Sequence, residues 1–313
     1  MVDWSTTAFM FPGQGAQTVG MAQDFADAYP VARQTFEQAD DLLGFALSKL
    51  CFEGPEEELN DTINTQPALY VSGIAILQVL QKEYPGASAA CVAGHSLGEL
   101  TALAAAGAMS FEDGLRLVRE RGRLMKEAGE KRPGAMAALL GLDAEVVREI
   151  CAKAREQTSG VLVLANDNCP GQNVISGDDA TLELGLVLAK EAGAKRAVRL
   201  AVSIAAHSPL MGPASDDFRK ALDATTFHAL QMPVYANVTA APLTSIEAIR
   251  DELGNQLTNS VRWTESVQAM IGAGAQQFIE LGPKDVLSGL LKRIDRTVKG
   301  TSLNSVTTLK QIA

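Results

Sequence analysis

The fold is decided by the stretch AACVAGHSLGELTALA at residues 89–104. A short apolar run ends at Gly94, Ser96 follows, and an alanine-rich, helix-forming run begins after Gly98. This order of strand, tight turn and helix is typical of a nucleophile elbow, whose strained turn leaves no room for side chains beside the serine. The turn presents the Ser96 hydroxyl at the carboxyl end of a sheet, near the first free amides of the helix. A serine that merely caps a helix is the simpler alternative, but the surrounding strand and helix favour a nucleophile.

Length and composition limit the class of protein. The chain has 313 residues, of which 47% are hydrophobic and 20% charged, as in a globular protein with a sizeable core. No stretch approaches the ~20 uninterrupted apolar residues of a membrane helix, and we find no secretory signal at the N-terminus. The 4 cysteines lack metal-ligand spacing, so we expect free thiols and a cytoplasmic protein. A net charge of −10 argues against nucleic acid as the main partner.

Predicted strands and helices alternate around the elbow. An apolar strand at 7–11 runs into a glycine-rich turn at 12–17, which is no dinucleotide fingerprint because position 18 is Thr18. Further strands are predicted at 233–237 and 277–281. Helices are predicted at 30–43, 68–83 with Pro67 opening it, 98–106, 110–128, 213–221, 245–257, 264–273 and 286–294. The predicted fold is therefore α/β, with a large α/β-hydrolase-like domain built on a parallel sheet.

The pattern changes after residue 130. Strands are predicted at 135–140, 160–165, 173–176 and 196–202, with helices at 144–155 and 180–192. This β-α-β-β-α-β order is typical of a ferredoxin-like unit. We therefore predict a small subdomain over 131–203, inserted into a discontinuous catalytic domain of residues 1–130 and 204–313.

A serine nucleophile needs a base at neutral pH, and the chain has 3 histidines. His95 adjoins Ser96, but neighbouring side chains on a strand point to opposite faces, so we interpret it as a packing or hydrogen-bonding residue. His228 has no catalytic context. His207 lies where the inserted segment rejoins the large domain, and clefts form at such seams, so His207 is the predicted base. No aspartate between Ser96 and His207 is marked as a third triad member, and a main-chain carbonyl is the alternative partner of the imidazole.

Five separated motifs together carry a resemblance to a known family. They are FPGQGAQ at 11–17, GHSLGE at 94–99, Arg121-Gly122, Ala206-His207-Ser208, and Gln256-Leu257 through Val261-Arg262-Trp263-Thr264. In this order, and over nearly the whole chain, they resemble the malonyl-CoA:acyl carrier protein transacylase family, which also has an inserted ferredoxin-like unit.

The resemblance implies a role for each matching residue. Ser96 would take the acyl group as an ester, and His207 would act first as base and then as acid. The backbone carbonyl of Gln256 would orient His207, which would explain the missing aspartate. The backbone amides of Leu97 and Gln14 would form the oxyanion hole.

Arg121 would pair with the free carboxylate of a malonyl group, because a guanidinium binds a carboxylate through two parallel hydrogen bonds.

The implied reaction is a ping-pong transfer from malonyl-CoA, through Ser96, to the phosphopantetheine thiol of acyl carrier protein, in fatty-acid or polyketide synthesis. We expect no metal, no tightly bound cofactor, no nucleic-acid or membrane partner, and a monomer. The segment 204–207 matches neither usual signature of related polyketide acyltransferase domains. Malonyl remains the favoured donor, and discrimination against methylmalonyl is left open.

Two other functions fit the elbow. One is a serine hydrolase or thioesterase, and the other is a non-catalytic docking relative that keeps the fold. The presence of Gln14, Ser96, Arg121 and His207 together argues against the docking relative. Carrier proteins are typically acidic, and the candidate docking cations are Lys190, Lys195, Arg196, Arg199, Lys292 and Arg293.

Overall fold

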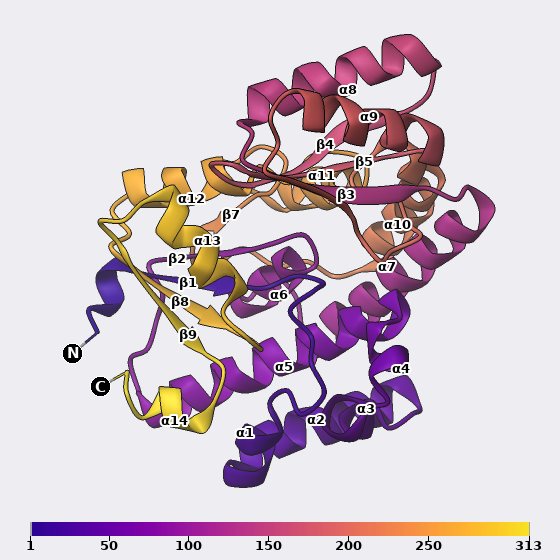
Figure 1. Ribbon diagram of the computed structural model, residues 1–313. Helices are drawn as coiled ribbons and strands as arrows, with labels where there is room; N and C mark the ends of the chain where they lie inside the picture. Colours follow the sequence, from indigo (N-terminus) through magenta and orange to yellow (C-terminus); the bar gives the residue numbers. More distant parts are fainter. Residues whose placement is uncertain (1, 313) are drawn as a thin grey trace.

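Two sheets organise the chain (Figure 1). The computed structural model describes residues 2–312. The larger sheet has five parallel strands in the order β7-β2-β1-β8-β9. Their bounds are β1 (Thr7–Phe11), β2 (Cys91–Gly94), β7 (Val234–Tyr235), β8 (Gln277–Leu281) and β9 (Lys299–Leu303). The predicted mixed α/β fold, with a parallel sheet and a separate small sheet, is confirmed.

Both faces of the parallel sheet are covered. In β1, which is buried along its whole length, Phe9 and Phe11 face one apolar cluster, and Ala8 and Met10 face another. This accounts for the continuous apolar run of β1, because a strand buried on both faces cannot alternate with polar residues. Figure 1 shows α5 (Thr62–Glu83) on one side of the sheet and α12 (Trp263–Gly272) with α13 (Val286–Ile294) on the other.

The central helix α5 is long and apolar enough to cross a membrane by length and composition. However, 83% of its 18-residue apolar window is buried inside the fold, so it is a core helix. It packs against α2 (Pro30–Leu43), α6 (Gly98–Ala105) and α7 (Phe111–Lys131). The other helices of the large domain are α1 (Gln23–Ala28), α3 (Leu47–Glu53), α4 (Glu56–Asn60), α10 (Gly212–Ala224), α11 (Ile246–Gln256) and α14 (Val306–Leu309), with short 3-10 turns at Trp4–Thr6 and Pro209–Met211.

The second sheet is antiparallel and lies within the segment predicted to form the small subdomain. Its strands, in the order β4-β5-β3-β6, are β3 (Ala135–Leu140), β4 (Leu162–Cys169), β5 (Gln172–Gly177) and β6 (Arg196–Arg199). Two helices, α8 (Ala144–Thr158) and α9 (Asp179–Glu191), cover one face, as the upper part of Figure 1 shows. Met136 and Val174 instead join the apolar cluster of the large domain. The face of this sheet that α8 and α9 do not cover therefore packs against the large domain.

Several element boundaries differ from the predicted ones. The predicted helix at 68–83 begins at Thr62, with Asp61 as its N-cap, so Pro67 lies inside the helix and does not open it. Proline has no amide to donate to the carbonyl of Ile63, and the Arg119 side chain donates to that carbonyl instead, at 2.7 Å. This partner comes from α7, and local sequence gives no sign of it.

The strand boundaries also move. Strand β4 continues to Cys169, beyond the predicted end at residue 165, while β6 ends at Arg199 and β7 keeps only Val234 and Tyr235. Strand β9 was not predicted, because its sequence KGTSL is polar and only Leu303 is buried at this edge of the sheet. Edge strands need not carry an apolar pattern.

Candidate active site

Ser96 occupies a strained turn between β2 and α6. Its φ of 51° lies in the left-handed region, which is uncommon for a residue other than glycine. A Cβ added to Gly94 would lie 1.9 Å from the Gly98 carbonyl carbon, and one added to Gly98 would lie 2.0 Å from the Phe11 carbonyl oxygen. Both glycines are therefore required for the chain to pass through the turn, and the turn has the geometry of a nucleophile elbow.

Asn237, which the sequence did not single out, holds the elbow from the neighbouring strand. Its Oδ1 accepts a hydrogen bond from the Ser96 amide at 2.7 Å, and its Nδ2 donates to the Gly94 carbonyl at 2.7 Å. Asn237 is fully buried and follows β7, which pairs with β2. Polar residues that directly follow parallel strands lie at the same edge of the sheet. The position of Asn237 after a predicted strand is therefore the sequence signal that could have identified it.

His207 faces the Ser96 hydroxyl. Its Nε2 lies 2.8 Å from Ser96 Oγ, and its Nδ1 lies 2.9 Å from the Gln256 carbonyl oxygen and 3.2 Å from that of Asn259. Carbonyl oxygens only accept, so Nδ1 carries the proton and Nε2 is free to accept one. Burial, and next the positive charge of Arg121, lower the pKa of His207 to about 3. The imidazole is therefore neutral at pH 7.

Arg121 reaches the same hydroxyl from α7. Its Nη2 donates to Ser96 Oγ at 3.1 Å and to Gln256 Oε1 at 2.8 Å, and its Nη1 donates to Gln66 Oε1 at 2.9 Å. The side chain is 1% exposed, and burial lowers its pKa to about 10, although Glu99 opposes that shift. Arg121 therefore stays charged at pH 7 inside the protein. Its Nε has no hydrogen-bond partner within residues 2–312.

The buried carboxyl group of Glu99 contacts Gln256, the residue whose carbonyl faces His207. Gln256 Nε2 donates to the Ser96 carbonyl at 2.9 Å and also to Glu99 Oε2. Glu99 is completely buried, and burial together with nearby Glu252 raises its pKa well above the usual range. Sequence reasoning gave Glu99 no role of its own, although a charged residue in an apolar elbow helix is a signal of a buried polar network.

His95 has the place expected for a turn residue. Its Nε2 lies 2.8 Å from Asn168 Oδ1, and its ring contacts Trp263 edge-on at 5.6 Å between centroids. Burial lowers its pKa. Its hydrogen bond is directed to β4, away from the Ser96 hydroxyl, and Asn168 had not been singled out from the sequence. His228 is exposed, and its backbone amide donates to the Ala108 carbonyl.

The backbone amides of Gln14 and Leu97 have no hydrogen-bond partner in the part of the chain that the structure describes. Gln14 lies in the loop after β1, and Leu97 directly follows Ser96. The Gln14 side chain is held by the Thr62 hydroxyl, 3.0 Å from its Nε2. Gln14, Ser96 and Leu97 line one cavity, and two free amides there are suited to bind a developing oxyanion.

These residues line a cavity of about 200 Å³. Its polar floor contains Gln14, Ser96, Arg121 and His207. Its remaining walls come mainly from the antiparallel sheet and the segment before His207, namely Met136, Asn166, Asn168, Val174, Leu200, Val202, Ile204 and Ala206, with Thr62, His95, Leu97 and Met125 from the large domain. The cavity therefore lies between the two sheets and combines a hydroxyl, a neutral imidazole and a buried cation.

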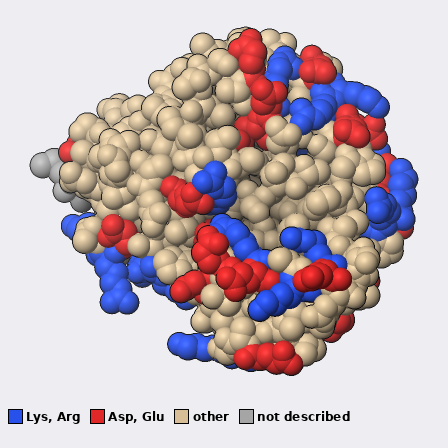
Figure 2. Space-filling view, turned by 90° about the horizontal axis from the view of Figure 1, so that it is seen from above, with Lys and Arg blue, Asp and Glu red and all other residues tan. Residues whose placement is uncertain are grey.

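The candidate docking cations are not a uniform basic patch. Arg199 forms ion pairs with Asp179 and Glu183, and Arg293 donates to Gln172 Oε1 and the Pro170 carbonyl. On the face that Figure 2 shows, basic and acidic side chains lie next to one another. The charges on that face are interspersed, so no single large patch of positive charge marks a docking surface there.

Comparison with known proteins agrees with the site. The chain matches the family described as "Acyl transferase domain" over residues 8–311. It is 44% identical over 306 residues to the malonyl CoA-acyl carrier protein transacylase of Bacillus subtilis (strain 168), covering 98% of this chain and 96% of that protein. It is 46% identical over 297 residues to the protein of the same name from Escherichia coli (strain K12), covering 95% of each.

Solved structures give the same result. An acyl carrier protein S-malonyltransferase from Vibrio cholerae O1 biovar eltor str. N16961 has a TM-score of 0.94 at 44% identity, covering 98% of this chain and all of that one. A malonyl-transacylase in complex with a type II PKS acyl-carrier protein has a TM-score of 0.95 at 43% identity, covering 98% of each. The fold and site define an acyltransferase enzyme. The chain belongs to the malonyl CoA-acyl carrier protein transacylase family within the acyl transferase domain family.

Proposed function

We propose that the protein transfers malonyl groups from malonyl-CoA to acyl carrier protein through an ester on Ser96. The observation that carries the proposal is the placement of Arg121, a buried cation 3.1 Å from the Ser96 hydroxyl that faces His207. A plain hydrolase needs no such cation. The activities named for the relatives from Bacillus subtilis and Escherichia coli support the same reaction.

The first half-reaction forms the ester. Ser96 Oγ bonds to the thioester carbonyl carbon while its proton passes to His207 Nε2, and the carbonyl electron pair moves to the oxygen. The amides of Gln14 and Leu97 bind that oxyanion. The carbonyl then re-forms, the carbon–sulfur bond breaks, and His207 returns the proton to the CoA sulfur.

The second half-reaction reverses these steps with a different thiol. The phosphopantetheine thiol of the carrier protein gives its proton to His207 and attacks the ester carbonyl. The carbon–oxygen bond to Ser96 breaks, and the proton passes back to Ser96 Oγ. The Gln256 and Asn259 carbonyls accept hydrogen bonds from His207 Nδ1–H throughout, and they stabilise the imidazolium while it exists.

Arg121 selects an acyl group that carries a carboxylate. A buried guanidinium without a full set of partners is costly, and a carboxylate compensates its charge with strong, directional hydrogen bonds. Its unpartnered Nε leaves donor capacity for this purpose. An acyl group without the carboxylate leaves the cation unpaired, so it reacts more slowly.

The proposal includes a holo acyl carrier protein as the partner, a cytoplasmic monomer, and no tightly bound cofactor. The solved complex of a related malonyl-transacylase with a type II PKS acyl-carrier protein supports this kind of partner. Fatty-acid and polyketide synthesis both use such a transfer.

A mass measurement tests the acyl-enzyme directly. The protein is exposed briefly to malonyl-CoA, digested, and analysed by mass spectrometry, with the Ser96→Ala variant as control. We expect the mass of one malonyl group on the peptide that contains Ser96, and none on the variant. Unmodified Ser96 in folded protein that still transfers malonyl to carrier protein would overturn the ester intermediate. Release of free malonate in place of transfer would identify a hydrolase.

A further inference from the structure

The loop that carries Gln14 is held by the first turn of α5. The Thr62 hydroxyl accepts a hydrogen bond from Gln14 Nε2 at 3.0 Å and lies 3.3 Å from Gln14 Oε1. Thr62 is 7% exposed and lines the active-site cavity, whereas the Gln14 side chain is exposed. The position of Gln14 therefore depends on a buried hydroxyl of another element.

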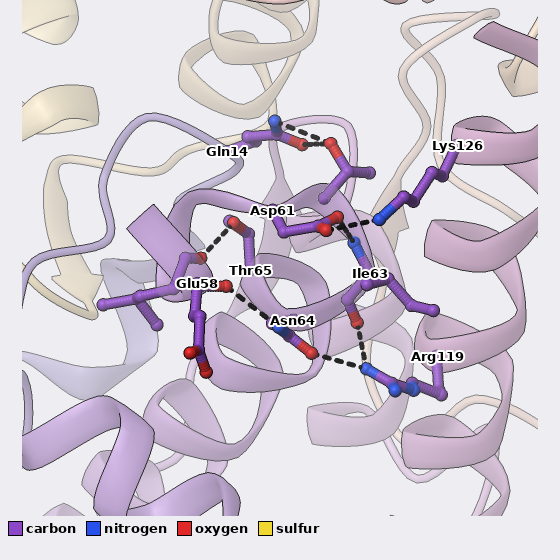
Figure 3. Close-up of polar contacts among 10 residues, drawn as sticks. Gln14, Glu58, Asp61, Ile63, Asn64, Thr65, Arg119 and Lys126 are labelled. Atoms are coloured by element: carbon purple, nitrogen blue, oxygen red, sulfur yellow. Dashed lines mark hydrogen bonds and ion pairs between the residues drawn. The ribbon is translucent and has the colours of Figure 1, made fainter. Parts of the chain in front are cut away.

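The same turn is tied to α7, the helix that carries Arg121. Asp61, the N-cap of α5, accepts hydrogen bonds from the Ile63 amide at 3.2 Å and from Lys126 Nζ at 2.5 Å. Arg119 Nη1 donates to the Ile63 carbonyl at 2.7 Å and to Asn64 Oδ1 at 2.8 Å. Figure 3 shows Lys126 and Arg119 approaching the start of α5 from α7. Two cations that flank Arg121 in sequence therefore hold this turn.

The other end of the loop is also fixed. Gln17 Nε2 donates to Asn60 Oδ1 at 2.7 Å, just before α5, and Gln17 Oε1 accepts from the Gly15 amide at 2.6 Å. Lys284 Nζ, from the segment after β8, donates to the Gly15 carbonyl at 3.2 Å and the Gln17 carbonyl at 2.9 Å. Asn60 and Lys284 thus hold residues 15–17 of the loop in place. The hydrogen bond to Thr62 is the contact that then fixes the position of Gln14.

We propose that Thr62 is a positioning residue for the oxyanion hole, and that the Asp61–Lys126 ion pair sets Thr62 relative to Arg121. The group that binds the acyl carboxylate and the amide that binds the thioester oxygen are thereby held at a fixed separation. This inference rests on the proposed role of the Gln14 amide. It assigns no chemistry to Thr62, which acts through Gln14.

The expected effect is on the chemical step. Loss of an oxyanion donor costs ~10²–10³ in rate, and a displaced donor loses part of that. Thr62→Val keeps the shape of the side chain and removes the hydroxyl. We expect it to lower kcat about tenfold or more, with little change in KM for malonyl-CoA, because Arg121 still binds the carboxylate. Thr62→Ser keeps the hydroxyl and restores the rate.

The ion pair is tested in the same assays. Lys126→Met lowers the rate in the same direction, and the double variant with Thr62→Val is no slower than Thr62→Val alone, because both act on one contact. Lys220→Met is the matched control, since Lys220 forms an exposed ion pair with Asp217 on α10. We expect Lys220→Met to leave kcat and KM for malonyl-CoA unchanged.

A second readout separates this inference from the proposed substrate. A neutral alkyl fluorophosphonate reacts with Ser96 and places an oxygen in the oxyanion hole without needing a carboxylate. Thr62→Val slows this reaction and Thr62→Ser restores it, with thermal unfolding midpoints close to that of the parent protein. Equal phosphonylation rates for Thr62→Val and the parent protein would overturn the positioning role. Slowed phosphonylation, together with no malonyl transfer by the parent protein, would overturn the proposed function and leave the positioning role in place.

Discussion

Arg121 donates a hydrogen bond to Ser96, with its Nη2 lying 3.1 Å from the hydroxyl oxygen that faces His207. A carboxylate is a stronger acceptor for a guanidinium than a hydroxyl is. In the proposed reaction, an incoming carboxylated acyl group would therefore compete with Ser96 for Arg121 and free a lone pair of the hydroxyl oxygen for attack. The proposed function would thus link substrate selection and activation of the Ser96 hydroxyl through this one contact.

The first prediction concerns selectivity. Arg121→Ala should lower kcat/KM for malonyl-CoA by about 10²–10³, the cost of losing one partner of a buried charge pair. The value for acetyl-CoA should change far less, because acetyl has no carboxylate. Steady-state transfer to carrier protein measures both. Arg116→Ala on the same helix is the control, since the Arg116 side chain is 67% exposed and forms its ion pair with Glu112. If the ratio of kcat/KM for malonyl-CoA to kcat/KM for acetyl-CoA did not change in Arg121→Ala, the proposed role of Arg121 would be contradicted.

The second prediction is a pH profile. Because the pKa of His207 is lowered to about 3, the rate of Ser96 phosphonylation should stay flat on acidification through pH ~6.5, the ordinary range of histidine. Arg121→Ala removes one cause of the low pKa, so the acidic limb should move to higher pH. His228→Gln should leave the profile unchanged. An acidic limb near pH ~6.5 in the parent protein would mean that His207 is not desolvated as described.

The same shift predicts how stability depends on pH. In the unfolded chain histidine binds its proton near pH ~6.5, whereas folded His207 does so only near pH 3. Between these values the unfolded state holds more protons, so the contribution of His207 to the free energy of unfolding is complete above pH ~6.5 and is lost as the pH falls toward 3. In denaturant titrations, the free energy of unfolding of the parent protein should therefore fall relative to that of His207→Gln as the pH is lowered from about 6.5 toward 3, and a pH-independent difference would contradict the shift.

The third prediction tests the tight turn. Gly98→Ala should lower the thermal midpoint sharply and abolish Ser96 acylation, because its Cβ would lie 2.0 Å from the Phe11 carbonyl oxygen. Gly289→Ala in α13 is the matched change, since nothing lies within 4 Å of its Cβ position. It should stabilise the protein by about 0.5–1 kcal/mol. Circular dichroism melts compare them, and equal effects would exclude close packing at the elbow.

The fourth prediction concerns Asn237. Asn237→Ala leaves the Ser96 amide and the Gly94 carbonyl without their partner, so we expect a loss of about 1–3 kcal/mol in the free energy of unfolding. Asn255→Ala, an exposed asparagine, should change stability much less. Chemical denaturation measures both variants. Equal stabilities would show that Asn237 does not hold the elbow.

Two of the predicted site residues are marked by their local context. Ser96 lies between a glycine that ends a strand and one that begins a helix, and His207 lies at the end of an inserted unit. The roles of Gln14, Leu97, Arg121 and Gln256 came only from the family resemblance. Asn237 and Glu99 carry no such mark. Asn237 acts on a residue 141 positions away, and Glu99 acts on Gln256, 157 positions away. Only the strand order that brings these segments together shows what they do.

The errors in the elements have the same origin. Pro67 was placed at a helix start because proline favours the first turn, yet Arg119 supplies the donor that proline lacks and the helix extends to Thr62. Strand β9 was missed because pairing with β8, and not an apolar pattern, defines it. In both cases a contact made only in the folded chain overrides the local preference.

The antiparallel sheet enters the chain after α7 and leaves it before His207. It forms much of one cavity wall but supplies neither the nucleophile, the histidine nor the cation. Substitutions within one continuous stretch of sequence, residues 135–199, can therefore change this wall without altering Ser96, Arg121 or His207, which are encoded on either side of it.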